Sequence, residues 1–124
     1  ETTLRLAEVA NIVAVKEASA NLEQIARICR DRPTDFAVLS GDDATTLAVM
    51  RAGGEGVISV VSNATPRLMA ELCERAADGD WTAADAIAAR LAPWMAAAFV
   101  ESNPIPVKAA MAMQGRLTDA LRLP

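Results

Sequence analysis

Three short runs of apolar residues alternate with longer stretches in which apolar residues recur every three or four positions. The runs are NIVAV at 11–15, DFAVL at 35–39 and GVISVV at 56–61. They are continuous rather than alternating, which is typical of strands buried on both faces of a parallel sheet. Their spacing along the chain suits right-handed parallel crossovers, so we expect a β-α-β-α-β-α order preceded by a short helix.

The intervening stretches carry helix start and stop signals. Asn21 is a candidate N-cap for a helix that ends before Pro33, because an asparagine side chain accepts a hydrogen bond from the first turn and proline interrupts the helix. A second helix is centred on Leu47. A third begins at Pro66, which suits a first helical turn, and ends at DGD, residues 78–80.

No strand pattern follows residue 80. We expect a long alanine-rich helix, kinked at Pro93, and a further helix over residues 106–114 after the two prolines of NPIPVK. The division we predict is an α/β part over 1–79 and a helical part over 80–124. Tryptophans at 81 and 94 in the helical part are expected to pack against helices or a neighbouring subunit.

Composition and charge narrow the class of protein. Apolar residues make up 52% of the 124 residues, which favours one folded domain, and the net charge of −4 is spread over interleaved acidic and basic residues. We therefore expect no nucleic acid partner, and the apolar runs are far below the roughly 18 residues of a membrane span. Cys29 and Cys73 lack metal-site spacing, so we predict no metal, no cofactor, and reduced core thiols in a cytoplasmic protein. Neither end has the features of a complete domain, and we expect a piece of a longer chain.

Lys16 follows the first apolar run, where active sites of parallel α/β folds assemble. Burial at that position would disfavour the ammonium and leave a neutral amine. Such an amine attacks a ketone or aldehyde to form a Schiff base. The alternative is a lysine that reaches solvent or pairs with Glu17. The chain has no His and no Tyr, so other groups must move protons.

Two further segments are expected at the same edge. Gly41, in SGDD, leaves the second strand and would allow close approach of a ligand, whereas Asp42 or Asp43 would otherwise serve as a helix N-cap. The GVISV segment brings serines to the end of the third strand. Because Asp42, Asp43 and Glu55 would oppose a phosphate, a small monocarboxylate held by uncharged groups suits these segments better. Two architectures fit this arrangement, an open doubly wound sheet and part of a (β/α)₈ barrel, and the lack of GxGxxG disfavours dinucleotide binding.

Taken together, five segments resemble the dihydrodipicolinate synthase family of pyruvate-dependent class I aldolases, which includes N-acetylneuraminate lyase. The segments are NIVAVKEASANLEQI, FAVLSGDDATTL, GGEGVISVVSN, FVESNPIPVKAAM and LRLP, in family order and spacing. The resemblance implies the C-terminal part of a (β/α)₈ barrel, strands six to eight, followed by a C-terminal helical domain. It also implies a homo-oligomer, a tetramer or dimer, in which the remainder of the barrel completes the fold.

The implied reaction condenses pyruvate with L-aspartate-4-semialdehyde on the path to lysine. By resemblance, Lys16 is the Schiff-base lysine, Ile58 contacts bound pyruvate, and Gly41 lines the site beside the lysine. The family's paired threonines, relay tyrosine and semialdehyde-binding arginine match no segment here, and their positions lie upstream. Two other hypotheses remain: a sister activity that cleaves a sugar acid or a 2-keto-3-deoxy acid, and an inert assembly module.

Overall fold

The computed structural model describes residues 1–122. The strands are β1 (Ala14–Glu17), β2 (Ala37–Ser40) and β3 (Gly56–Val57). The helices are α1 (Thr2–Leu6), α2 (Leu22–Asp31), α3 (Thr46–Arg51), α4 (Pro66–Ala77), α5 (Trp81–Ala97) and α6 (Ile105–Met113), and a 3-10 turn, η1 (Val61–Asn63), follows β3. The predicted alternation of strands and helices, followed by a helical part, is confirmed.

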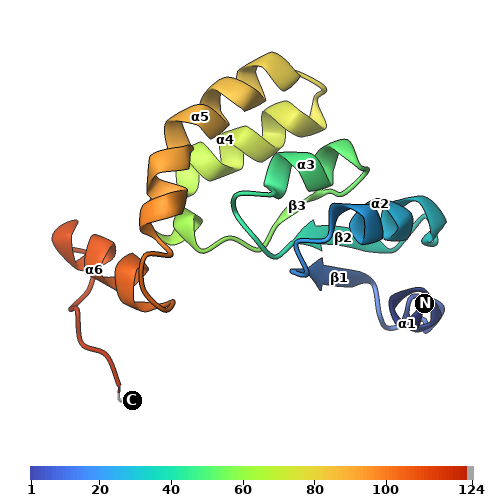
Figure 1. The fold of residues 1–124 in the computed structure, drawn as a ribbon, viewed down its shortest axis with the longest axis horizontal. Coiled ribbons are helices and arrows are strands. Elements are labelled where there is room, and N and C mark those ends of the chain that lie inside the picture. Colours follow the sequence, from blue (N-terminus) through green and yellow to red (C-terminus); the bar gives the residue numbers. More distant parts are fainter. Residues whose placement is uncertain (123–124) are drawn as a thin grey trace.

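The three strands form one parallel sheet in the order β1-β2-β3 (Figure 1). Lys16 of β1 is paired with Leu39 of β2, which is paired with Gly56 of β3. Each connection runs through a helix, as parallel neighbours require. The α/β class with three parallel strands is therefore confirmed.

Local signals set the start and end of α2 and the start of α4 as expected. The Asn21 side chain accepts a hydrogen bond from the Gln24 N–H at 3.0 Å, and α2 ends at Asp31, ahead of the proline at 33. Pro66 lies in the first turn of α4. The Asp80 carboxylate caps α5 by accepting from the Ala83 N–H at 3.1 Å.

The bounds of all three strands differ from those that the apolar runs predict. β1 covers residues 14–17 instead of 11–15, so Lys16 lies within the strand instead of after it. β2 is similarly displaced towards its carboxyl end. The third strand, expected over 56–61, stops at Val57, because the amides of residues 60 and 61 bond a carboxylate from another loop and the chain turns into η1.

Helices α2 and α3 cover one face of the sheet. Side chains from these helices and from β2 form a buried cluster against which Val15 of β1 packs; its members are Ile25, Ile28, Phe36, Val38 and Val49. Side chains alternate between the faces of a strand, and on the opposite face Ala14 and Lys16 are exposed. The expectation of strands buried on both faces is wrong for the described residues, because helices cover only one of them.

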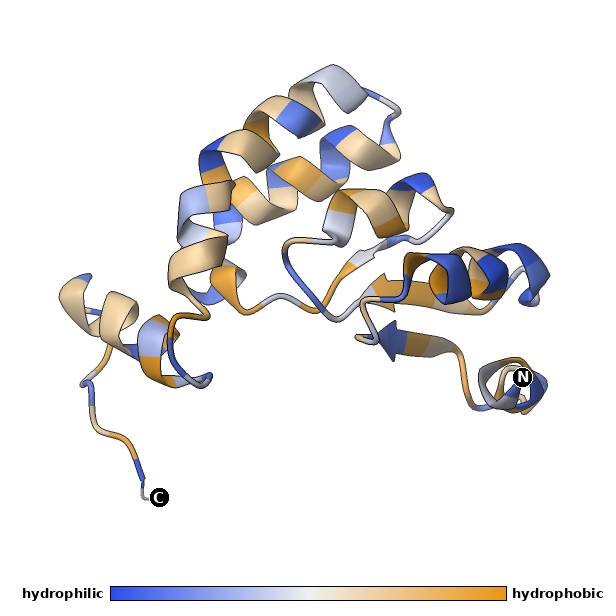
Figure 2. Cartoon of the chain, in the orientation of Figure 1, coloured by the Kyte–Doolittle hydropathy of each residue, from blue (hydrophilic) through white to orange (hydrophobic). Residues whose placement is uncertain are grey.

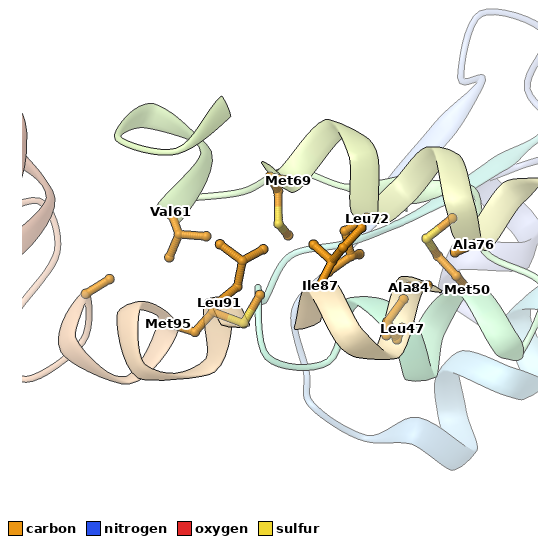
Figure 3. Packing of buried hydrophobic residues seen from close by; sticks show 11 residues of the cluster. Leu47, Met50, Val61, Met69, Leu72, Ala76, Ala84, Ile87, Leu91 and Met95 are labelled. Carbon is orange, nitrogen blue, oxygen red and sulfur yellow. The ribbon is translucent and has the colours of Figure 1, made fainter. Parts of the chain in front are cut away.

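A second cluster joins the end of the sheet to the helices that follow it (Figure 3). It draws side chains from α3, η1, α4 and α5, among them Val61, Met69, Leu72, Ile87, Leu91 and Met95. Figure 2 shows apolar residues on the facing sides of α4 and α5. Both tryptophans pack against this cluster, which confirms helix packing as their role in the described structure. The division between residues 79 and 80 stays a prediction.

Candidate functional site

Lys16 lies near the carboxyl end of β1, on the sheet face that α2 and α3 leave uncovered. Its side chain is exposed. The expected low-dielectric surroundings are therefore absent from this part of the protein. The reason is geometric: within residues 1–122, β1 pairs with β2 alone, and no helix covers its outer face.

Glu17 faces the other way and holds the loop after β1. Its carboxylate accepts hydrogen bonds from the Ser19 N–H at 2.7 Å and from the Gln24 side-chain amide at 3.4 Å. None of the ion pairs found among the described side chains includes Lys16. The alternative in which Glu17 neutralises Lys16 is not supported, because neighbouring residues of a strand point to opposite faces.

Gly41 continues the ladder between β2 and β1. Its N–H donates to the Glu17 carbonyl at 2.7 Å. A Cβ atom at this position would lie 2.5 Å from the Ala18 Cβ and 3.2 Å from the Glu17 carbonyl oxygen. The glycine therefore permits close approach of the neighbouring strand, in addition to any ligand.

Ile58 shares the open face with Lys16. Its N–H donates to the Ser40 carbonyl at 2.8 Å, which extends the ladder one residue past β3, and its side chain is 47% exposed. The register places Lys16 level with Gly56, so Ile58 lies on the same face but two strands away and two residues further along, a separation of about 12 Å. Gly41 lies at the rim between them, so the three predicted site residues gather at one edge of the sheet.

Hydroxyl groups hold the loop that leaves β2. The Ser40 hydroxyl donates to the Asp42 carbonyl at 2.7 Å, and the Thr46 hydroxyl donates to the Asp43 carbonyl at 2.9 Å. Both hydroxyl-bearing residues are buried. Satisfied polar groups in a buried loop restrict its conformations, so Gly41 lies in a well-defined turn.

Asp43 has a role that the sequence analysis missed. It is 2% exposed, and its Oδ2 accepts from the Val60 N–H at 3.0 Å and the Val61 N–H at 3.2 Å. Its other oxygen is buried and has no hydrogen-bond partner among the described residues. The expectation that Asp42 or Asp43 caps the next helix is wrong: Thr45 holds the N-cap position, and the Asp42 carboxylate accepts from the Ala44 N–H within its own loop. The consecutive aspartates after a strand were the only signal in the sequence.

Glu55 lies at the opposite end of the sheet from the predicted site. It precedes β3, pairs with Arg32 at 2.5 Å, and accepts from the Val38 N–H at 2.8 Å. It therefore does not add charge at the rim beside Gly41. Of the three carboxylates expected to oppose a phosphate, only those of Asp42 and Asp43 lie in the loop beside Gly41.

A groove of about 770 Å³ opens on the helix side of the rim. Ala18, Gly41 and Asp42 form one wall, and the other is formed by α5, including Met95, and by Phe99 just beyond it. Neither Lys16 nor Ile58 lines it. The groove and the open sheet face are thus two separate surfaces that meet at Gly41.

The two thiols have the character of core residues. Burial is the main cause that raises the pKa of Cys73, and the nearby carboxylates of Glu74 and Asp43 act in the same direction. Burial also raises the pKa of the Cys29 thiol. Within residues 1–122 no cluster of three potential metal ligands occurs, and none of the helices there has the length and apolarity to cross a membrane.

Comparison with known proteins gives consistent matches over the whole chain. It is 49% identical over 123 residues to the 4-hydroxy-tetrahydrodipicolinate synthase of Koribacter versatilis, covering 99% of this chain and 41% of the relative. It is 52% identical over 124 residues to the same enzyme of an Acidovorax species, covering 100% of this chain and 42% of the relative. The chain thus spans about two-fifths of the length of these relatives.

Solved structures agree with these matches. A dihydrodipicolinate synthase from Aquifex aeolicus superposes with a TM-score of 0.95 at 43% identity, covering 98% of this chain and 42% of that one. A chloride-inhibited dihydrodipicolinate synthase from Acinetobacter baumannii, complexed with pyruvate, gives a TM-score of 0.94 at 37% identity, again with 98% and 42% coverage. The model of the dihydrodipicolinate synthetase family matches residues 1–124. Because the family model covers the whole chain and the relatives and solved structures agree with it, the chain belongs to the dihydrodipicolinate synthetase family.

Proposed function

We propose that the protein carrying this chain condenses pyruvate with L-aspartate-4-semialdehyde to give 4-hydroxy-tetrahydrodipicolinate, with Lys16 as the covalent residue. The observation that carries the proposal is the Lys16 amine on the open sheet face, which it shares with Ile58. Relatives at about half identity bear this enzyme's name, and one solved neighbour contains pyruvate. We propose that the strands are the sixth to eighth of a (β/α)₈ barrel.

The amine would act as a nucleophile, and the protonated imine that it forms would act as the electron sink. Its nitrogen attacks the ketone carbon of pyruvate, and loss of water leaves a C=N bond to Lys16. The protonated imine draws electrons from the adjacent methyl carbon, which loses a proton to give an enamine. That carbon then bonds to the aldehyde carbon of the semialdehyde, whose oxygen gains a proton. The amino nitrogen of the semialdehyde finally bonds to the imine carbon, which closes the ring, and the bond from that carbon to the Lys16 nitrogen breaks to free the lysine. Ile58 would pack against bound pyruvate, and Gly41 would leave space beside it.

Other parts of the protein would complete the site. The attacking amine must be neutral, and burial favours that form, yet Lys16 is exposed in this chain. We propose that the rest of the barrel covers the open face and supplies the proton-transferring groups. The helical part would take part in a homo-oligomer, as the family resemblance implies.

Reductive trapping tests the assignment. The full-length protein incubated with pyruvate and borohydride should acquire a stable adduct at Lys16, located by peptide mass spectrometry. Lys16→Arg should abolish the adduct, because a guanidinium stays protonated and is a poor nucleophile. Lys108→Arg is the matched control, since Lys108 is the only other lysine in this chain, and that variant should still be trapped. An adduct at another residue, or none, would overturn the role of Lys16.

The choice of aldehyde is tested separately. The full-length protein should consume pyruvate with L-aspartate-4-semialdehyde faster than it cleaves sugar acids or 2-keto-3-deoxy acids. A sister activity would show the reverse preference while keeping the Lys16 adduct. A panel of these substrates with the wild-type protein separates the two reactions.

A further inference from the structure

We infer that Asp43 is a positioning residue for the reaction at Lys16: it holds the turn after β3 so that Ile58 keeps its place on the sheet face that carries the lysine amine. The inference rests on the proposed function, since it concerns the geometry of that site. Asp43 itself is 2% exposed, on the helix side of the rim, and it therefore acts through Ile58 instead of touching the substrate.

Two hydrogen bonds to one carboxylate oxygen fix the turn after β3. Asp43 Oδ2 accepts from the Val60 N–H at 3.0 Å and the Val61 N–H at 3.2 Å, seventeen and eighteen residues away. Bonds to an ionised acceptor are stronger than neutral ones, and burial strengthens them further. They divert the chain from the sheet directly after Ile58.

The chain just before this loop also bonds the start of the turn segment, residues 58–61. The Ser40 carbonyl accepts from the Ile58 N–H at 2.8 Å, three residues before Asp43. The loop is itself held by the hydroxyls of Ser40 and Thr46, which donate to the carbonyls of residues 42 and 43. Residues 58–61 are therefore hydrogen-bonded at both ends to residues 40–43. Of these bonds to residues 40–43, those at residues 60 and 61 are made by a side chain, that of Asp43.

The far side of the turn is anchored independently. The Val61 carbonyl accepts from the Trp94 indole N–H at 3.2 Å and from the Thr65 hydroxyl at 2.9 Å. The Val61 side chain is buried in the second core cluster (Figure 3). Loss of the Asp43 bonds would therefore loosen the path from Ile58 to Val61 while the rest of the helical part stays packed. The expected effect is on pyruvate binding more than on folding.

Asp43→Asn in the full-length protein tests this role. Asparagine keeps the size of the side chain, but its amide nitrogen must replace one carboxylate oxygen. It would either face the two N–H donors or occupy the buried position of Oδ1, where the described residues offer no partner. We expect the pyruvate concentration that half-saturates borohydride trapping to rise about tenfold, equivalent to about 1.4 kcal/mol. The adduct yield at saturating pyruvate should stay unchanged, because Lys16 is intact.

A matched control separates positioning from lost stability. Ile28→Ala removes a buried side chain from the other core cluster, on α2. It should lower the thermal midpoint but leave half-saturation unchanged. Amide hydrogen exchange provides a second readout: Asp43→Asn should speed exchange in the peptide that contains Val60 and Val61, and Ile28→Ala should not.

A second variant, Asp43→Glu, serves if Asp43→Asn does not fold. It keeps the carboxylate but adds one methylene, so the oxygen that accepts from the Val60 and Val61 N–H groups must move. It should raise half-saturation in the same direction, by a smaller factor. Unchanged half-saturation in a folded variant, with a normal wild-type adduct, would overturn the inference alone. Absence of the wild-type Lys16 adduct would overturn the proposed function and this inference with it.

Discussion

Gly41 occupies a position where the neighbouring strand leaves no room for a side chain. The ideal Cβ would meet the Ala18 Cβ at 2.5 Å and the Ala18 Cα at 3.1 Å. The Glu17 carbonyl oxygen, 3.2 Å away, is itself the acceptor for the Gly41 N–H. The backbone contact at the rim therefore explains the glycine before any ligand is considered.

Gly41→Ala is expected to destabilise the protein by about 1–3 kcal/mol, the range for overpacking a well-packed position. The added methyl group must displace Ala18 or weaken the hydrogen bond that the residue 41 N–H donates to the Glu17 carbonyl. Urea unfolding of the full-length protein measures the change.

A double-mutant cycle identifies the clash. Ala18→Gly removes the 2.5 Å contact but leaves the contacts with Cα and the carbonyl oxygen. The double variant should therefore recover part of the stability that Gly41→Ala loses. If the two changes simply add, the Ala18 methyl is not the cause.

At the scale of elements, Arg32 and Glu55 join the loops that enter β2 and β3. Arg32 donates to the Phe36 carbonyl, to the Gly53 carbonyl at 2.9 Å, and to the Glu55 carboxylate at 2.5 Å. Glu55 in turn accepts from the Val38 N–H of β2 at 2.8 Å. Side chains thus continue the strand pairing at the amino end of the sheet, opposite the site.

Arg32→Lys is expected to lower the free energy of unfolding by about 1–3 kcal/mol, because one ammonium cannot replace a guanidinium that bonds both loops. The Arg32 side chain is only 15% exposed, so water cannot replace the lost bonds fully. Urea unfolding measures the loss. Arg30→Lys is the matched control: that arginine is exposed and bonds only the adjacent Asp31, so its replacement should leave stability unchanged. Equal effects of the two variants would contradict a role for the Arg32 network.

The elements themselves follow from local patterns to different degrees. The start of α2 was predictable because its cap is made within three residues, between Asn21 and Gln24. The length of the third strand was not, because its end depends on a carboxylate from a distant loop. Apolar residues at 60 and 61 suit both a strand and a buried turn, and periodicity cannot distinguish them.

For the whole molecule, the open sheet face and the free edges of β1 and β3 are unpaired surfaces of the described chain. Val13 is 64% exposed beside the start of β1, and Ile58 is 47% exposed on the open face. Unpaired edges and exposed apolar residues favour association. The proposed barrel would cover both.

The 124-residue chain expressed alone is therefore expected to self-associate and to show little or no synthase activity. Light scattering and sedimentation measure the association. Val13→Lys places a charge beside the edge and should reduce it, because edge lysines oppose strand addition. A stable monomer with cooperative unfolding would contradict this expectation.

The sequence by itself determined the order of strands and helices, the Asn21 cap, and the three residues gathered at the rim, Lys16, Gly41 and Ile58. These features depend on short-range patterns, and the motifs carry the family resemblance. The tertiary structure alone decided which sheet face stays open, that Glu55 lies at the far end, and that Asp43 bonds the turn after β3. The reason is physical: a cap or a period is satisfied within a few residues, whereas a buried carboxylate takes whichever donors the packed chain brings to it.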